Sequence, residues 1–138
     1  MRILVIDAQG GGMGKQLVAA IRQGVPGAEI TAVGTNSVAT AAMRKAGADF
    51  SATGENAVVV ACRRTDVIVG PVGITIADAL LGEITPAMAV AVGQSSAKRV
   101  LIPFNHCDNI VVGVSNLSIG ALIQETVAIL RDLAEVRH

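Results

Sequence analysis

Residues 2–17 of the chain read RILVIDAQGGGMGKQL, in which a short aliphatic run leads into a cluster of glycines and then into the start of a helical pattern. The run Ile3–Ile6 is apolar at every position, as expected for a strand that is buried on both faces of a sheet. Four of the five residues from Gly10 to Gly14 are glycine, and Leu17 begins a set of apolar residues with helical spacing. This order of strand, glycine loop and helix predicts the first unit of a parallel α/β sheet.

The rest of the chain continues the alternation of short apolar runs and helical segments. Further strands are predicted at Ile30–Val33, Asp49–Ala52, Val67–Val69, Val100–Ile102 and Ile110–Val114, of which Asp49–Ala52 is the weakest. Helices are predicted after Gly14 until Gly24 and Pro26, over Val38–Lys45 with a Ser37 cap, over Glu55–Arg64, from the Thr85 cap and Pro86 to Gly93, and from about Ser118 to Val136. We therefore expect a single domain over residues 1–138. Its fold should be a three-layer Rossmann-like α/β fold with a mostly parallel sheet of about five or six strands.

The composition limits the classes of partner and the cellular compartment that we expect for this protein. Apolar residues make up 51% of the chain and charged residues 16%, against about 45–50% and 25% in ordinary soluble domains, so we expect a homo-oligomer that covers the surplus apolar surface. Eleven basic and eleven acidic residues cancel, which disfavours nucleic acid and a membrane surface as partners. The two cysteines, Cys62 and Cys107, and the lack of a predicted signal peptide or spanning segment favour a reduced, cytoplasmic protein.

Residues suited to ligand binding follow the predicted strands. The carboxyl ends of parallel strands lie along one edge of a sheet, where open α/β folds bind their ligands. Glycines, hydroxyls and side-chain amides gather in these loops, which makes this edge the predicted binding site for a small, phosphate-bearing molecule. The candidate ligand-binding residues are Gln9, Gly10, Gly11, Gly12, Met13, Gly14, Lys15, Thr35, Asn36, Ser37, Gly70, Pro71, Gly73 and Asn105.

The first of these loops carries the strongest signal. Glycine lets backbone N–H groups approach an anion, and the N-terminus of the following helix adds a partial positive charge, so Gly10–Gly14 predicts a phosphate-binding loop. Lys15 is expected to add a full charge. The alternative is a tight strand-to-helix turn that binds nothing.

The amino-acid sequence of this loop differs from the known phosphate-binding motifs. A GxGxxG motif from Gly10 would need glycine at Lys15, and GxxxxGK[ST] fails at Gln9 and at Gln16, where the magnesium-binding hydroxyl is missing. Residues 8–17 most resemble the TGxxxGxG turn of short-chain dehydrogenases, with Ala8 in place of the first glycine and Lys15-Gln16 in place of the last pair. Those enzymes use a Tyr-x-x-x-Lys pair, and this chain has no tyrosine, so the resemblance implies a binding loop without the active site.

The loop after the second strand leaves the identity of the ligand open. In dinucleotide-binding folds an acidic residue at this place binds the ribose and favours NAD. Thr35, Asn36 and Ser37 stand there instead. They are suited to a ribose or a second phosphate, and Ser37 is equally suited to capping a helix. NAD, NADP, a mononucleotide, coenzyme A and a sugar phosphate all remain candidates.

Few residues are candidates for chemistry. Asp7 is expected to orient the glycine loop, with metal binding as the alternative, and Glu55 to stabilise a helix start or contact the ligand. Cys107 is the one candidate nucleophile, but we do not expect it to pair with His106, because adjacent residues of an extended segment point to opposite sides. Asn105, His106 and Cys107 could supply metal ligands only across an oligomer, so no metal site is predicted, and Cys62 is expected in the core.

Several motifs together resemble a family of small bacterial proteins described only as a domain of unknown function. These motifs are QGGGMGK at 9–15, GTN at 34–36, ATGENA at 52–57, GPVGI at 70–74 and GEITPAMA at 82–89. They span nearly the whole chain, and one departure is Ala8, where glycine is expected. The resemblance supports the fold and implies no activity.

Three functions therefore remain open. The first is a ligand-binding or regulatory module for NAD(P) or another nucleotide. The second is a small oligomeric oxidoreductase or transferase whose site is completed across subunits. The third is an oligomeric scaffold without a ligand.

Overall fold

The computed structural model describes residues 1–104, 109–114 and 117–136 of the chain. Its elements in order are β1 (Arg2–Asp7), α1 (Gly12–Gly24), β2 (Glu29–Gly34), α2 (Ser37–Lys45), β3 (Phe50–Thr53), α3 (Glu55–Ala61), β4 (Val67–Pro71), the 3₁₀ helix η1 (Val72–Thr75), α4 (Pro86–Gln94), β5 (Lys98–Ile102) and α5 (Ile119–Val136). The strands form a five-stranded sheet in the order β3-β2-β1-β4-β5, and every pairing in it is parallel. This is the strand order of a Rossmann sheet, so the predicted fold class is confirmed, with the weak third strand present as β3.

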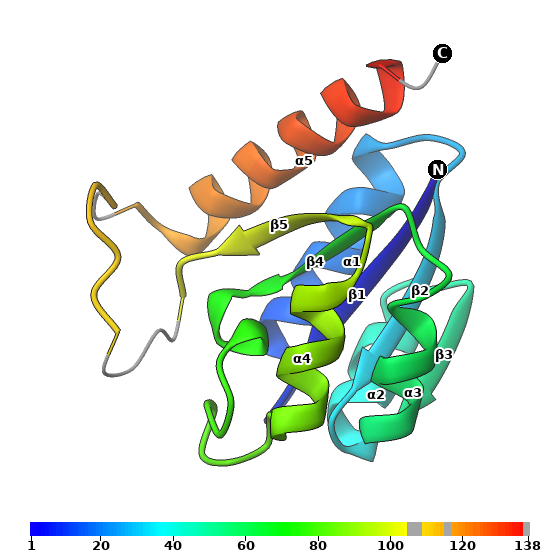
Figure 1. Cartoon of the computed structure of the whole chain (residues 1–138). Coiled ribbons are helices and arrows are strands. Elements are labelled where there is room, and N and C mark those ends of the chain that lie inside the picture. Colours follow the sequence, from blue (N-terminus) through cyan, green and yellow to red (C-terminus); the bar gives the residue numbers. More distant parts are fainter. Residues whose placement is uncertain (105–108, 115–116, 137–138) are drawn as a thin grey trace.

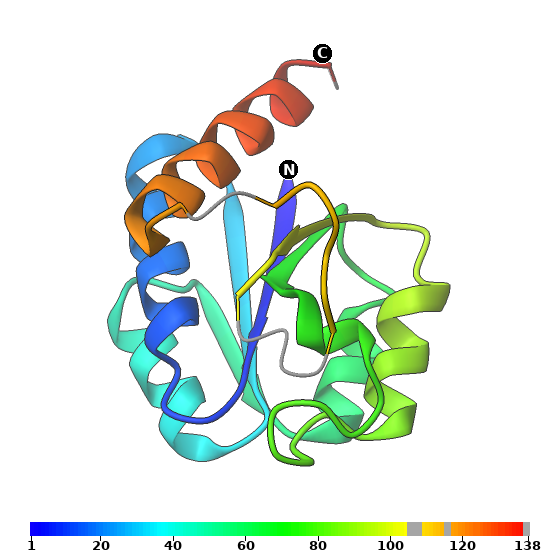
Figure 2. The same ribbon diagram turned by 90° about the vertical axis from the view of Figure 1, so that its left-hand side faces the viewer.

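Helices cover both faces of the sheet (Figure 1), and the three layers are visible in the turned view (Figure 2). Helices α1, α2 and α5 pack on one face, and α3 and α4 pack on the other. Along β1, Ile3 and Val5 belong to the first core, whereas Leu4 and Ile6 belong to the second. Burial on both faces explains why the first strand is apolar at every position.

The chain leaves the neighbouring strands β1 and β4 in opposite directions. After β1 it builds β2 and β3 on one side, and after β4 it builds β5 on the other. At such a switch point the loops separate, which opens a crevice outside the carboxyl ends of the two strands. This crevice lies between the glycine loop and the end of β4.

The strand predicted at Ile110–Val114 is wrong. Residues 109–114 form a turn and irregular backbone, with Gly113 in the left-handed region at φ 86°. Ile110 and Val112 are 91% and 94% exposed. β-branched residues favour a strand where a neighbouring strand supplies hydrogen bonds and side-chain packing. No such neighbour lies beside this segment in the described part of the chain.

Most helices begin and end near the predicted residues. Thr85 caps α4 as predicted, because its Oγ1 accepts the Met88 N–H at 3.2 Å. The cap of α2 is Asn36, whose Oδ1 accepts the Ala39 N–H at 2.9 Å, so the cap predicted at Ser37 is one residue off. None of the helices described combines the length and the hydropathy needed to cross a bilayer.

Candidate functional site

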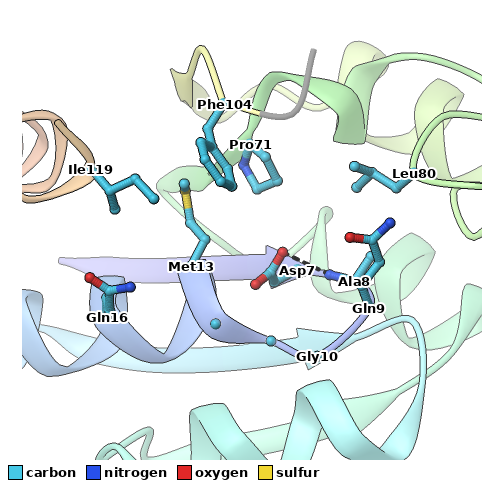
Figure 3. A pocket seen from close by; sticks show the side chains of 12 residues that line it. Asp7, Ala8, Gln9, Gly10, Met13, Gln16, Pro71, Leu80, Phe104 and Ile119 are labelled. Atoms are coloured by element: carbon cyan, nitrogen blue, oxygen red, sulfur yellow. Dashed lines mark hydrogen bonds between the residues drawn. The ribbon is translucent and has the colours of Figure 1, made fainter. Parts of the chain in front are cut away.

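A cleft of about 240 Å³ lies at this switch point, outside the carboxyl ends of β1 and β4 (Figure 3). Backbone of the glycine loop forms one wall, and Pro71, Leu80 and Phe104 lie across from it (Figure 3). The lining residues are Asp7, Ala8, Gln9, Gly10, Gly11, Gly12, Met13, Gln16, Pro71, Leu80, Phe104 and Ile119. The cleft thus joins a polar backbone surface to an apolar wall of side chains.

Two glycines of the loop are needed for packing. Gly11 has a left-handed φ of 73°, and a Cβ there would lie 2.8 Å from the Cα of Ala39. A Cβ on Gly14 would lie 2.5 Å from Met43 Sδ and 2.8 Å from Asp7 Cβ. Gly11 and Gly14 therefore let the loop and α1 pack closely on α2 and β1.

Two other glycines leave the backbone of the cleft wall open. A Cβ built on Gly10 or Gly12 would meet no heavy atom within 4 Å, and neither residue has a positive φ. The N–H groups of Gly10, Gly12 and Met13 donate to no acceptor among the described residues. Gly12 and Met13 begin α1, where N–H groups lack partners within the helix and the helix dipole favours an anion.

Lys15 takes a different position from the one predicted. Lys15 is exposed and is absent from the cleft lining, whereas Gln16 contributes to it. Consecutive helical residues point about 100° apart because a turn holds about 3.6 residues. The neutral side-chain amide of Gln16 therefore lines the cleft instead of the Lys15 ammonium group, and the main source of positive potential in the cleft is the backbone N–H groups.

Asp7 holds the glycine loop on the sheet. The side chain is buried, its Oδ1 accepts the Ala8 N–H at 2.8 Å and its Oδ2 accepts the Gly14 N–H at 2.7 Å. Burial raises the pKa of the Asp7 carboxyl, the two amide hydrogen bonds partly oppose this, and the nearby charge of Glu83 raises it further. The prediction that Asp7 orients the loop is confirmed. Within the described residues, no group of three or more His, Cys, Asp or Glu side chains could hold a metal ion.

Glu83 reaches the same edge of the sheet from the segment between η1 and α4. Its Oε1 accepts the Gln9 N–H at 3.0 Å, the Thr35 hydroxyl at 2.7 Å and the Asn36 side-chain amide at 2.8 Å. Burial by itself would raise the pKa of Glu83, but these three hydrogen bonds outweigh it and hold the pKa below the ordinary value. Thr35 and Asn36, predicted as ligand residues, therefore bind a carboxylate of the protein itself.

Glu83 is the residue of this edge that the sequence did not reveal. It lies 74 positions from Gln9 and 48 from Thr35, and no motif spacing connects them. The one local signal is the place of Glu83 within the stretch Gly82–Ala89, which resembles the family motif. Only the fold of the segment before α4 brings its carboxylate to the end of β2.

The residues after β4 divide between lining and packing. Pro71 lines the cleft, and its predicted ligand contact stays a prediction. Gly70 is packed against β1, because a Cβ there would lie 2.6 Å from the carbonyl oxygen of Ile6. Gly73 is buried in η1, where a Cβ would lie 3.3 Å from Leu80 Cγ. Neither glycine belongs to the cleft lining, and both are closely packed, so a ligand contact by either one stays a prediction.

Glu55 and Cys62 do not line the cleft. Glu55 is the first residue of α3, and its Oε1 accepts the Thr85 hydroxyl at 2.5 Å, which ties α3 to the cap of α4. Cys62 is buried in the core as predicted, and burial raises the pKa of its thiol to about 11, which keeps it unreactive at neutral pH. The candidates Asn105, His106 and Cys107 lie outside the described residues.

A family model described as "Domain of unknown function (DUF3842)" matches residues 2–135. The chain belongs to this family. The resemblance seen in the five sequence motifs is thereby confirmed, whereas a kinship of the glycine loop with short-chain dehydrogenases stays a prediction. A comparison with curated proteins finds no match for the DUF3842 domain.

Among solved structures, the DUF3842 domain is similar to a dodecameric FMN-dependent UbiX-like decarboxylase from Escherichia coli O157:H7. The two are 23% identical, with a TM-score of 0.48, and the match covers 97% of this chain and 76% of that chain. Likeness at this level concerns the fold alone.

Proposed function

We propose that this DUF3842 domain is a binding module for a phosphate-bearing ligand, a nucleotide or a dinucleotide such as NAD(P), which it holds in the cleft. In this proposal the phosphate accepts hydrogen bonds from the N–H groups of Gly10, Gly12 and Met13. The observation that carries the proposal is the pair of open glycines at the positive end of α1. Packing and backbone conformation do not require glycine at positions 10 and 12, whereas close approach of an anion does.

The apolar wall supports an organic ligand over inorganic phosphate. Met13, Leu80, Phe104 and Ile119 offer a surface suited to a base or another flat apolar group. The cleft volume of about 240 Å³ is below the roughly 300–1,000 Å³ of complete ligand sites. A nucleotide would therefore extend beyond the cleft along the edge of the sheet.

The lining favours binding over catalysis by the protein's own side chains. Asp7 is the one titratable side chain among the described residues of the lining, and both of its oxygens hold backbone amides. Glu55 bonds to Thr85 instead of facing the cleft lining. The described residues of the lining therefore offer no acid, base or nucleophile that is not already bonded to the protein backbone.

The Gly12→Val variant is expected to lose its ligand response while keeping its fold. The valine side chain has open space around its Cβ, so it fits the protein but occupies the position from which a phosphate would reach the N–H groups. The measurement is thermal unfolding with NAD, NADP, FMN, adenine and guanine nucleotides, coenzyme A and sugar phosphates. A ligand at about 100 times its dissociation constant adds roughly 2.7 kcal/mol of stability, which shifts the Tm of a domain of this size by several degrees.

Two control variants accompany this test. Gly93→Ala also adds a Cβ in open space, but in α4, away from the cleft, so its ligand shift should equal that of the wild type. Lys15→Ala should also keep most of the shift, because Lys15 is absent from the lining. A full ligand shift in Gly12→Val would contradict the proposed site. No shift in the wild type with any of these compounds would favour the scaffold.

A further inference from the structure

The Glu83 carboxylate lies near the end of β2, where NAD-binding sheets of this topology carry an acidic residue. In dinucleotide-binding folds, an acid shortly after the second strand accepts hydrogen bonds from the ribose hydroxyls. Here β2 ends at Gly34, and Thr35 and Asn36 follow without an acid. The bonds from the Thr35 hydroxyl (2.7 Å) and the Asn36 amide (2.8 Å) bring the carboxylate of Glu83 to this point from a distant part of the chain.

The Glu83 carboxylate retains acceptor capacity. A carboxylate has two oxygens with about four acceptor positions. All three hydrogen bonds to Glu83 fall on Oε1, and Oε2 accepts none from the described residues. Donors from two different loops fix the side chain, and the lowered pKa keeps it ionised at neutral pH. A fixed carboxylate with an open oxygen is a strong acceptor for ligand hydroxyl groups.

Glu83 also borders the cleft. Its backbone N–H donates to the Leu80 carbonyl at 3.2 Å, and its Oε1 accepts the Gln9 N–H at 3.0 Å. Leu80 and Gln9 both line the cleft, and Gln9 precedes Gly10, the first of the proposed phosphate-binding amides. The carboxylate thus lies beside the phosphate position, on the side toward which a ligand larger than the cleft would extend.

We propose that Glu83 is the ribose-binding residue of this domain, with Oε2 accepting hydrogen bonds from the 2′- and 3′-hydroxyls of a ribonucleotide whose phosphate lies on the glycine loop. This assignment rests on the proposed function. It requires that a 2′-deoxyribose bind more weakly, because a donor is lost. It also requires that a 2′-phosphate bind more weakly, because a second negative charge meets the carboxylate. The site therefore selects NAD over NADP.

The test measures binding by titration calorimetry for wild type and Glu83→Gln. The probes are the 5′-monophosphates of adenosine and guanosine, their 2′-deoxy forms, NAD and NADP. Wild type should bind a ribonucleotide roughly tenfold more tightly than its 2′-deoxy form, as expected for one hydrogen bond to a charged group. In Glu83→Gln this ratio should fall toward one, because the carboxamide keeps an oxygen for the loops but loses the open acceptor. The preference for NAD over NADP should shrink as well.

The matched control is Glu29→Gln, which makes the same chemical change at the opposite end of β2 and should leave both ratios unchanged. A purely structural role of Glu83 would weaken ribose and deoxyribose ligands equally, which would overturn the assignment. Equal affinities of the wild type for the two sugars, or a preference for NADP, would overturn it even if Glu83→Gln failed to fold. Binding without sugar discrimination overturns only the role of Glu83, whereas no binding at all removes the proposed function and this inference together.

Discussion

Gly70→Ala is expected to lower the free energy of unfolding by about 3 kcal/mol, the upper part of the range for overpacked cores. The new Cβ would lie 2.6 Å from the carbonyl oxygen of Ile6 and 2.9 Å from Ile74 Cδ1. Ile74 can change its rotamer, but the Ile6 carbonyl belongs to β1, the central strand, which pairs with β2 on one side and β4 on the other. Moving it would disturb both pairings.

Urea unfolding followed by far-UV circular dichroism measures this loss, since the chain has no tryptophan or tyrosine for fluorescence. A loss of 3 kcal/mol corresponds to a fall in Tm of roughly 10 °C. Gly93→Ala serves as the comparison, because its Cβ is unobstructed and alanine is the better helix former, so it should be neutral or stabilising by up to about 1 kcal/mol. Equal free energies of unfolding for the two variants would contradict this prediction, because they would show that β1 can move away from the new Cβ without a loss of stability.

Asp7→Ala is expected to destabilise the domain by about 3 kcal/mol at neutral pH. The change leaves the buried N–H groups of Ala8 and Gly14 without their acceptor, at a cost of about 1–3 kcal/mol each. Removal of a buried charge offsets part of that cost. Asp7→Asn keeps one acceptor oxygen and should lose less. Calorimetric unfolding of the three proteins gives this order directly, and a loss in Asp7→Asn as large as in Asp7→Ala would contradict it.

The effect of Asp7→Ala should also depend on pH. The folded-state pKa of Asp7 is raised above the ordinary value of 3.8, so the folded protein holds this proton more tightly than the unfolded chain. Protonation of the Asp7 carboxyl therefore adds stability. This contribution is fully present below the pKa of Asp7 in the unfolded chain, and it is lost as the pH rises through the pKa of Asp7 in the folded protein. The stability difference between wild type and Asp7→Ala should therefore shrink from acid to neutral pH. A difference that grows with pH would mean that the amide bonds outweigh burial.

The strands and the position of the cleft were predictable from local patterns. Continuous apolar runs indicated strands buried on both faces, and Asp7 before a glycine cluster indicated a loop at a sheet edge. The prediction of a strand at Ile110–Val114 was wrong, because a run of β-branched residues does not indicate whether a partner strand lies beside it.

The glycines show where prediction from sequence stopped. The sequence does not distinguish the four glycines of the loop. In the structure, Gly11 and Gly14 pack against other elements, whereas Gly10 and Gly12 are open to the cleft. The difference depends on which atoms lie near the missing Cβ. Those atoms belong to α2 and β1, so they are known only once the helices are placed on the sheet.

The amino-acid sequence by itself predicted the Rossmann-like sheet, the edge that holds the cleft and the glycine loop at the start of α1, because strands, helices and turns leave local patterns of apolar residues and glycines. The tertiary structure alone decided that Lys15 is absent from the cleft and that Glu83 joins Thr35 and Asn36. A hydrogen bond across 48 positions leaves no periodic trace in a sequence. The donor and the acceptor meet only because the fold of the segment before α4 brings the Glu83 carboxylate to the end of β2.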